Sequence, residues 1–87
     1  MHDETEQYRR AKVAAINSQV QSEDKDEERR RLEAAHGQVW NTDEMANDFE
    51  GLSFAAPFII VRRKSDNQKG SLEFQHMPRF YFNFRPA

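Results

Sequence analysis

The spacing of apolar residues in this 87-residue chain changes between its N-terminal and C-terminal parts. Residues 58–64 are rich in β-branched residues and begin with four consecutive apolar side chains, which indicates a strand that is buried on both faces at its start. From residue 71 onward, apolar side chains alternate with polar ones, and this period of two is typical of β-strands. The pattern predicts strands at residues 58–64, 71–76 and 79–85. A polar turn ending at Gly70 separates the first two strands, and Pro78 interrupts the pattern before the third, because proline cannot donate to a ladder. Such short, successive strands favour a three-stranded antiparallel meander.

The alternation also assigns side chains to the two faces of the sheet. The second strand is expected to be half-buried, with one side formed by Leu72, Phe74 and His76 and the other by Ser71, Glu73 and Gln75. In the third strand, the apolar side is formed by Phe80, Phe82 and Phe84. Its opposite, outer side carries Arg79, Tyr81, Asn83 and Arg85.

The first half of the chain has the composition and spacing of helices. Residues 5–21 contain no Gly or Pro, and Val13, Ile16 and Val20 form a narrow apolar stripe at helical spacing. A second helix is expected from about residue 24 to 36, with Ser22 or Asp24 as its N-cap and Gly37 as its end. Nothing between the two segments forbids helix, so the region forms either a helical hairpin, which we favour, or one long helix.

A short third helix is predicted after Trp40. Asn41 or Thr42 can cap it, and Gly51 is suited to the position after its last residue. The helical spacing of Met45, Phe49 and Leu52 supports this interpretation and, with Phe54, makes these side chains core candidates. The residues expected to form the main core are Trp40, Phe49, Phe58, Ile60, Leu72, Phe74, Phe80 and Phe82.

These elements define a single small α+β domain over residues 1–87, with the helical hairpin (or one long helix) and the short helix packed on the meander. Within it, residues 1–36 form an acidic helical region that can protrude, residues 37–56 form a short helix and connection, and residues 57–87 form the sheet. The net charge of −2 conceals an asymmetry between the two halves. Residues 1–50 carry a charge of −6 and residues 51–87 a charge of +4, so one of these surfaces can face a charged partner.

Composition limits the chemistry that is available. The chain has no cysteine, which excludes disulfides, thiolate metal sites and cysteine nucleophiles. Its three glycines are too scattered for a phosphate-binding loop, and its three histidines lack the spacing of metal ligands. We therefore expect no enzymatic activity, no cofactor and no metal. The N-terminus resembles no secretory signal, and no apolar run reaches the roughly 18 residues of a membrane span, so we expect a soluble cytoplasmic protein without membrane association.

Two functions remain for a chain of this kind. The first is a protein-interaction module (a small adaptor, inhibitor or accessory subunit) that binds a partner or a second copy. It would act through its helical face, with Val13, Ile16 and Val20, or through an exposed strand edge, at residues 58–64 or 79–85. The alternative is a nucleic-acid-binding protein, because Arg and Tyr on an open sheet suit phosphate contact and base stacking. The residues of that outer face are Arg63, Arg79, Tyr81, Asn83 and Arg85. The overall acidity favours the first function.

Overall fold

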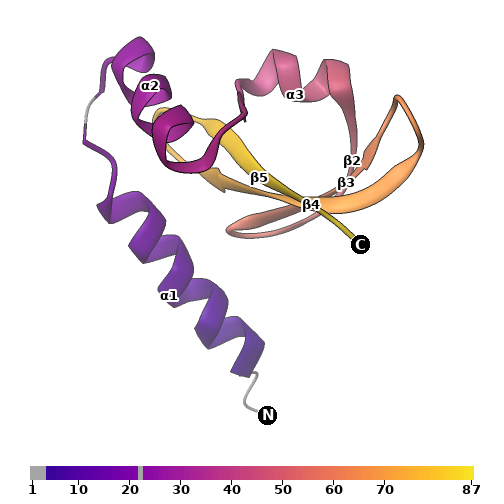
Figure 1. Cartoon of the computed structure of the whole chain (residues 1–87). Coiled ribbons are helices and arrows are strands. Elements are labelled where there is room, and N and C mark those ends of the chain that lie inside the picture. Colours follow the sequence, from indigo (N-terminus) through magenta and orange to yellow (C-terminus); the bar gives the residue numbers. More distant parts are fainter. Residues whose placement is uncertain (1–3, 22) are drawn as a thin grey trace.

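The computed structural model describes residues 4–21 and 23–87, and it confirms the α+β class (Figure 1). In this part of the chain, three helices accompany one five-stranded antiparallel sheet. The helices are α1 (Glu4–Ser18), α2 (Lys25–His36) and α3 (Thr42–Asp48). The strands are β1 (Val39–Trp40), β2 (Phe49–Ala55), β3 (Phe58–Arg63), β4 (Gln68–Gln75) and β5 (Phe80–Pro86).

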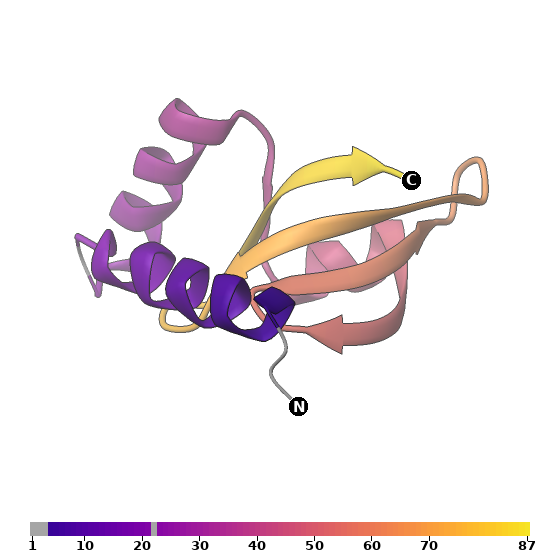
Figure 2. The same cartoon turned by 90° about the horizontal axis from the view of Figure 1, so that it is seen from below.

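The sheet is larger than the predicted three-stranded meander. Its strand order is β1-β5-β4-β3-β2, so that a four-stranded meander from β2 to β5 gains the short β1 at its far edge. In β1, only Val39 and Trp40 pair, opposite Phe82 and Tyr81. One edge of the sheet is therefore β2, and the other is β1 followed by the part of β5 that extends beyond it (Figure 2).

The N-terminal region forms two helices, as the favoured hairpin interpretation predicted. Asp24 is the N-cap of α2 and accepts hydrogen bonds from the backbone N–H groups of Asp26 and Glu27, whereas Ser22 lies outside the described residues. Gly37 ends α2 with a positive φ of 85°, a conformation that glycine adopts without steric cost. The helix α1 ends at Ser18 and the cap at Asp24 starts a separate helix, so the two segments do not form one long helix.

The predicted end of the third helix is wrong. Asn41 caps α3 through a capping box with Glu44, but the helix ends at Asp48 and the chain continues directly as β2. Gly51 consequently lies inside a strand, and Leu52 and Phe54, expected in the core, are exposed. The helical spacing of the apolar residues was coincidental here, because the strand begins at Phe49 in the middle of it.

Each face of the sheet has its own hydrophobic cluster. The cluster on the α3 face contains Trp40, Met45, Phe49, Ile59, Val61, Leu72 and Tyr81, with Phe74 and Phe84 packed against it. The cluster on the face of α1 and α2 contains Leu32, Val39, Phe80 and Phe82, with Ile16 beside it. Five of the eight predicted core residues are buried: Trp40, Phe49, Leu72, Phe80 and Phe82. Phe58, Ile60 and Phe74 are only half-buried. In β3, Ile59 and Val61 face the α3 side and fill the core instead.

Phe84 faces the opposite side from Phe80 and Phe82, contrary to the predicted alternation. The pairing between β4 and β5 shifts register between Ser71 and Glu73, and within that interval Asn83 has a positive φ of 56°. This bulge adds one residue to β5, so the side chain of Phe84 turns to the α3 face.

Glu73 and Gln75 are buried, so β4 is not the half-buried strand that its alternation predicted. The helices α1 and α2 cover these side chains and supply their partners. Lys12 of α1 lies 3.0 Å from a carboxylate oxygen of Glu73, and the amide of Gln75 donates to Glu28 of α2 at 3.2 Å. Polar residues can face a helix layer when that layer brings matching groups.

Among the described residues, no helix is long and apolar enough to cross a membrane.

Candidate functional site

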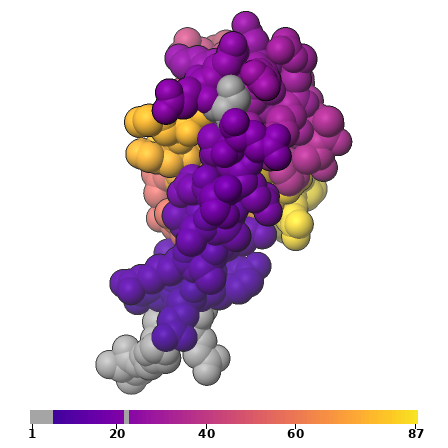
Figure 3. Space-filling view, turned by 90° about the vertical axis from the view of Figure 1, so that its left-hand side faces the viewer, coloured from indigo at the N-terminus to yellow at the C-terminus, as the bar shows by residue number. Residues whose placement is uncertain are grey.

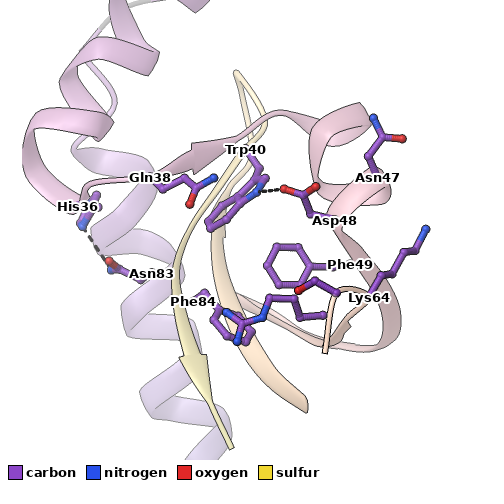
Figure 4. Close-up of a pocket in the computed structure, with 11 residues that line it drawn as sticks. His36, Gln38, Trp40, Asn47, Asp48, Phe49, Lys64, Asn83 and Phe84 are labelled. Atoms are coloured by element: carbon purple, nitrogen blue, oxygen red, sulfur yellow. Dashed lines mark hydrogen bonds between the residues drawn. The ribbon is translucent and has the colours of Figure 1, made fainter. Parts of the chain in front are cut away.

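A cleft of about 620 Å³ opens between α3, the start of β1 and the ends of β3 and β5 (Figure 4). Its walls come from four separate segments of the chain, which the sheet and α3 bring together. The lining residues are His36, Gln38, Trp40, Asn47, Asp48, Phe49, Arg63, Lys64, Ser65, Asn83 and Phe84. A volume of this size falls within the range of about 300–1,000 Å³ that is typical of small-ligand pockets.

Three aromatic rings form the inner wall of the cleft. The ring of Phe49 lies edge-on to Trp40, with 5.2 Å between centroids, and tilted against Phe84 at 5.1 Å. The indole N–H of Trp40 donates to Asp48 at 2.9 Å, which fixes the orientation of the indole ring. The wall is therefore apolar, and the indole N–H within it is paired.

The charged residues of the cleft differ in how strongly they are paired. Arg63 donates two hydrogen bonds to Asp66, at 2.7 and 3.0 Å, while its guanidinium lies 4.9 Å from the centroid of Phe84. The hydrogen bond from Arg63 lowers the pKa of Asp66. Lys64 donates to the backbone carbonyl of Ala46 at 2.8 Å and makes no ion pair within the described chain. The positive charge of Lys64 at the rim of the cleft is thus not compensated by a carboxylate.

A second candidate surface lies at the opposite edge of the sheet, on β2. Phe54 is 66% exposed and Leu52 is 43% exposed, and Tyr8 of α1 is 60% exposed. A hollow lined mainly by apolar groups connects Tyr8 and Phe54 with the half-buried Phe58 and Ile60. We call these five residues (Tyr8, Leu52, Phe54, Phe58 and Ile60) the β2 surface.

The helix α1 forms one side of the β2 surface. Figure 3 shows α1 as a ridge over the strands, and the N-terminal end of α1 extends past them. The predicted stripe of Val13, Ile16 and Val20 is half-buried, and Ile16 packs inward against the cluster beneath α2. The exposed aromatic residue of α1 is instead Tyr8, which precedes Val13 by more than one helical turn.

The five residues predicted on the outer face of the sheet do not form one surface. Arg63 and Asn83 line the cleft. Tyr81 is buried, with 3% exposure, and Arg79 lies over Phe74 at 4.6 Å and donates to the Tyr81 hydroxyl at 3.4 Å. Arg85 is exposed near the end of β5. Since helices cover parts of both faces, the sheet presents no open platform of Arg and Tyr side chains at these positions.

One of the two predicted strand edges is not an edge. Residues 58–63 form β3, which pairs with β2 on one side and β4 on the other. The other predicted edge, 79–85, belongs to β5, and its part beyond Phe82 has no strand on its outer side in the described structure.

The described residues contain no group of three or more His, Asp or Glu side chains that could hold a metal ion. His36 stacks on Phe82 at 4.5 Å between centroids, and its Nδ1 lies 3.3 Å from the amide nitrogen of Asn83. His76 is exposed in the turn after β4.

Sequence reasoning missed the β2 surface and the role of the cleft. Leu52 and Phe54 were assigned to the core because the strand that carries them was interpreted as the end of a helix. Trp40 and Phe49 were predicted as core residues, and their buried rings do also form the cleft wall. The signal that could have revealed β2 is the apolar alternation of Leu52 and Phe54 around Ser53, next to a glycine.

Comparison with known proteins gives no match: no protein-family model, no curated protein and no solved structure resembles this chain significantly.

Proposed function

We propose that this protein is a non-enzymatic interaction module, an adaptor, inhibitor or accessory subunit, that binds a partner protein through the β2 surface. The exposure of Phe54 and Leu52 on an edge strand carries this proposal. Native sheets usually protect their edges with lysine, proline, a bulge or a covering element, and β2 has one bulge, between Gly51 and Ser53. β2 has neither lysine nor proline, and its one charged residue is Glu50. Apolar side chains gathered on an uncovered edge are typical of an interaction site.

The proposed site combines a helix with a strand edge, but they differ from those that the sequence suggested: α1 contributes Tyr8 and Arg9 instead of the stripe of Val13, Ile16 and Val20, and the edge is β2. Tyr8 and Arg9 of α1 lie beside Phe54 and Ala55 of β2 around the same hollow. A partner seated there would contact the helical face and the strand edge together. Aromatic groups supply much of the affinity at such contacts because they bury a large area with few rotatable bonds.

The irregularity of β2 indicates which forces would dominate binding. Its register with β3 shifts between Gly51 and Ser53, leaving Leu52 without a pairing partner on β3. A bulge bends a strand and disturbs its ladder, so a partner strand cannot pair evenly along the whole edge. We therefore assign the affinity mainly to the apolar side chains and only secondarily to backbone hydrogen bonds.

The test compares lysine substitutions on and off the β2 surface. The full chain and its variants Leu52→Lys, Phe54→Lys and Met77→Lys are used to capture partners from the source cell, with and without nuclease. Met77 is the matched control, because it is 73% exposed but lies in the turn between β4 and β5. We expect specific proteins to be retained by the parent chain and Met77→Lys and lost with Phe54→Lys, regardless of nuclease treatment. Hydrogen exchange in the purified complex should then show protection of β2 amides.

Equal recovery of partners by Phe54→Lys and Met77→Lys would refute the proposal. Loss of all partners after nuclease would instead favour the alternative of nucleic-acid binding, which would then need residues other than the buried Tyr81.

A further inference from the structure

The face of the sheet that α1 crosses is covered only in part by the described helices. In Figure 2, α1 lies in front of the sheet and α3 behind it, and β3, β4 and β5 extend past the N-terminal end of α1. Glu73 of β4 faces α1, because it contacts Lys12. Alternate residues of a strand, and residues paired directly across two strands, share a face. The side chains on the uncovered part are therefore those of Ile60, Arg62, Lys69, Ser71 and Arg85.

Positive charge is in excess on this part of the sheet. Arg62 is paired directly with Lys69, and like charges in such a position destabilise a sheet. Arg62 also forms an ion pair with Glu50 of β2, whereas Lys69 and Arg85 form none within the described residues. Together with the ion pair between Lys12 and Glu73, the face thus carries four cations and two carboxylates. Two positive charges remain without a partner, which favours an anionic ligand.

An exposed aromatic ring and a hydroxyl group lie beside these cations. Tyr8 of α1 is 60% exposed, and it lines one hollow together with Ile60 and Ser71. Ser71 is in turn paired with Arg85. Serine hydroxyls and cationic side chains bind phosphate oxygens, and an exposed tyrosine ring can stack on an unpaired base. An acidic polypeptide would use the cations alone, so the ring beside them favours a ligand with both anionic groups and planar bases.

We infer that these residues form a binding face for single-stranded nucleic acid, with backbone phosphates at Lys69 and Arg85 and a base stacked on Tyr8. Of the residues that the sequence analysis assigned to a nucleic-acid-binding face, only Arg85 belongs to this one. The inference goes beyond the proposed function, because Lys69 and Arg85 are not part of the β2 surface. Tyr8 belongs to both, so a bound strand and a protein partner would compete for it.

The test measures binding of the full chain to fluorescently labelled oligothymidylate and oligouridylate by fluorescence anisotropy. Labelled polyglutamate, a polyanion without bases, is the comparison ligand. We expect the oligonucleotides to bind about tenfold more tightly than polyglutamate, since one stacked base contributes roughly this factor. If two phosphates are neutralised, the logarithm of the binding constant should fall with that of the salt concentration with a slope of about −1.4.

Three substitutions locate the phosphate contacts. Lys69→Gln and Arg85→Gln should each weaken oligonucleotide binding about two- to fivefold and bring the salt slope closer to zero by about 0.7. Lys64→Gln is the matched control, because Lys64 is also exposed and without an ion pair in the described chain but lies at the cleft on the opposite face. Thermal unfolding separates binding from structure: Lys69→Gln removes the repulsion with Arg62, so it should melt at or above the parent temperature while it binds more weakly.

Two substitutions at Tyr8 test the stacking of a base. Tyr8→Ala should weaken binding of the oligonucleotides about tenfold, and Tyr8→Phe, which keeps an aromatic ring, should bind like the parent. Leu52→Ala alters the β2 surface without a change of charge, and it should bind the oligonucleotides as the parent does. Failure of this inference can therefore be distinguished from failure of the proposed partner site.

The inference is overturned if no oligonucleotide binds at low salt, or if Lys64→Gln weakens binding as much as Lys69→Gln. Binding of polyglutamate as tight as that of the oligonucleotides would also overturn it and would indicate an acidic polypeptide as the ligand. Unchanged binding in Tyr8→Ala would refute the stacked base and with it the inference.

Discussion

Gly70 lies where β4 passes closest to β5, and replacing it with alanine gives a sharp test of this packing. A Cβ atom at Gly70 would lie 2.4 Å from the carbonyl oxygen of Arg85 and 2.7 Å from the ring of Phe84. Ordinary contact requires at least 3.4 Å, so the end of β5 must move by about 1 Å. The backbone oxygen cannot rotate away as a flexible side chain could.

The cost of this displacement can be estimated from the contacts that it breaks. The end of β5 is held by the bond from the Ala87 N–H to the carbonyl of Lys69, at 2.9 Å, and by the pairing of Pro86 with Gly70. Each lost hydrogen bond costs about 1 kcal/mol, and loosening the Phe84–Phe49 pair costs about 0.5–1.5 kcal/mol. Alanine recovers up to about 1 kcal/mol by restricting the unfolded chain. The net destabilisation is therefore about 1–3 kcal/mol.

Thermal unfolding followed by circular dichroism measures this effect. For a chain of this size, each kcal/mol lowers Tm by about 4–8 °C, so Gly70→Ala should melt about 5–20 °C below the parent. Gly51→Ala is the matched control, because it also lies in a strand but its Cβ would meet only the Ile59 side chain at 3.4 Å. It should melt near the parent temperature. Equal melting temperatures for the two variants would show that the close contact between β4 and β5 is wrong.

Three further predictions concern the helices and the core. Burial tends to raise the pKa of Glu28, but hydrogen bonds, chiefly from Arg31 and Gln75, outweigh it and lower that pKa. Glu28 therefore contributes stability above its unfolded pKa of about 4.3, and this stability is lost as pH falls through the folded pKa. Glu28→Gln should be less stable than the parent at pH 7, and urea unfolding should show the difference narrowing below about pH 4; a constant difference would contradict this. Phe74→Ala should cost about 2–3 kcal/mol, since the side chain is only half-buried, and an unchanged urea midpoint would count against its packing. Deleting residues 1–21 should leave a cooperative thermal transition at a lower temperature, because the ion pair with Glu73 is lost; an unfolded circular dichroism spectrum would show that α1 is indispensable.

Local sequence signals predicted those elements whose ends are set by one residue with a particular backbone preference or hydrogen-bonding group. The N-cap at Asp24, the glycine end at Gly37 and the capping box that begins at Asn41 all follow from short-range hydrogen bonding. The strand β3 follows from its β-branched residues, and β4 and β5 follow from alternation and from the break at Pro78. These features depend on neighbours within a few residues, which sequence reasoning can evaluate.

Features that depend on distant residues could not be predicted. Glu73 is buried because Lys12, far away in sequence, meets it across the α1 interface. β2 could not be distinguished from a helix end, because Met45, Phe49 and Leu52 fit a helical period. In the structure, Phe49 and Leu52 belong to β2. The candidate site also depends on distant residues. Arg63 and Asn83 were predicted as surface residues, but the cleft that they line is formed by segments that are far apart in the sequence.

The positive φ of Asn83 has a consequence for how mutations could alter the cleft. Because of the extra residue, the two ends of β5 present their aromatic side chains on opposite faces of the sheet. Phe80 and Phe82 pack beneath α2, whereas Phe84 forms part of the cleft wall on the α3 face. Asn83→Val would disfavour the positive φ of 56° at this position. If position 83 then became a regular strand residue, strict alternation would turn the ring of Phe84 towards α1 and α2. The cleft would then lose one of its three rings while the sheet kept its strands and their order. A single substitution, which in most strands only disturbs local packing, would here remove one ring from the wall of a pocket.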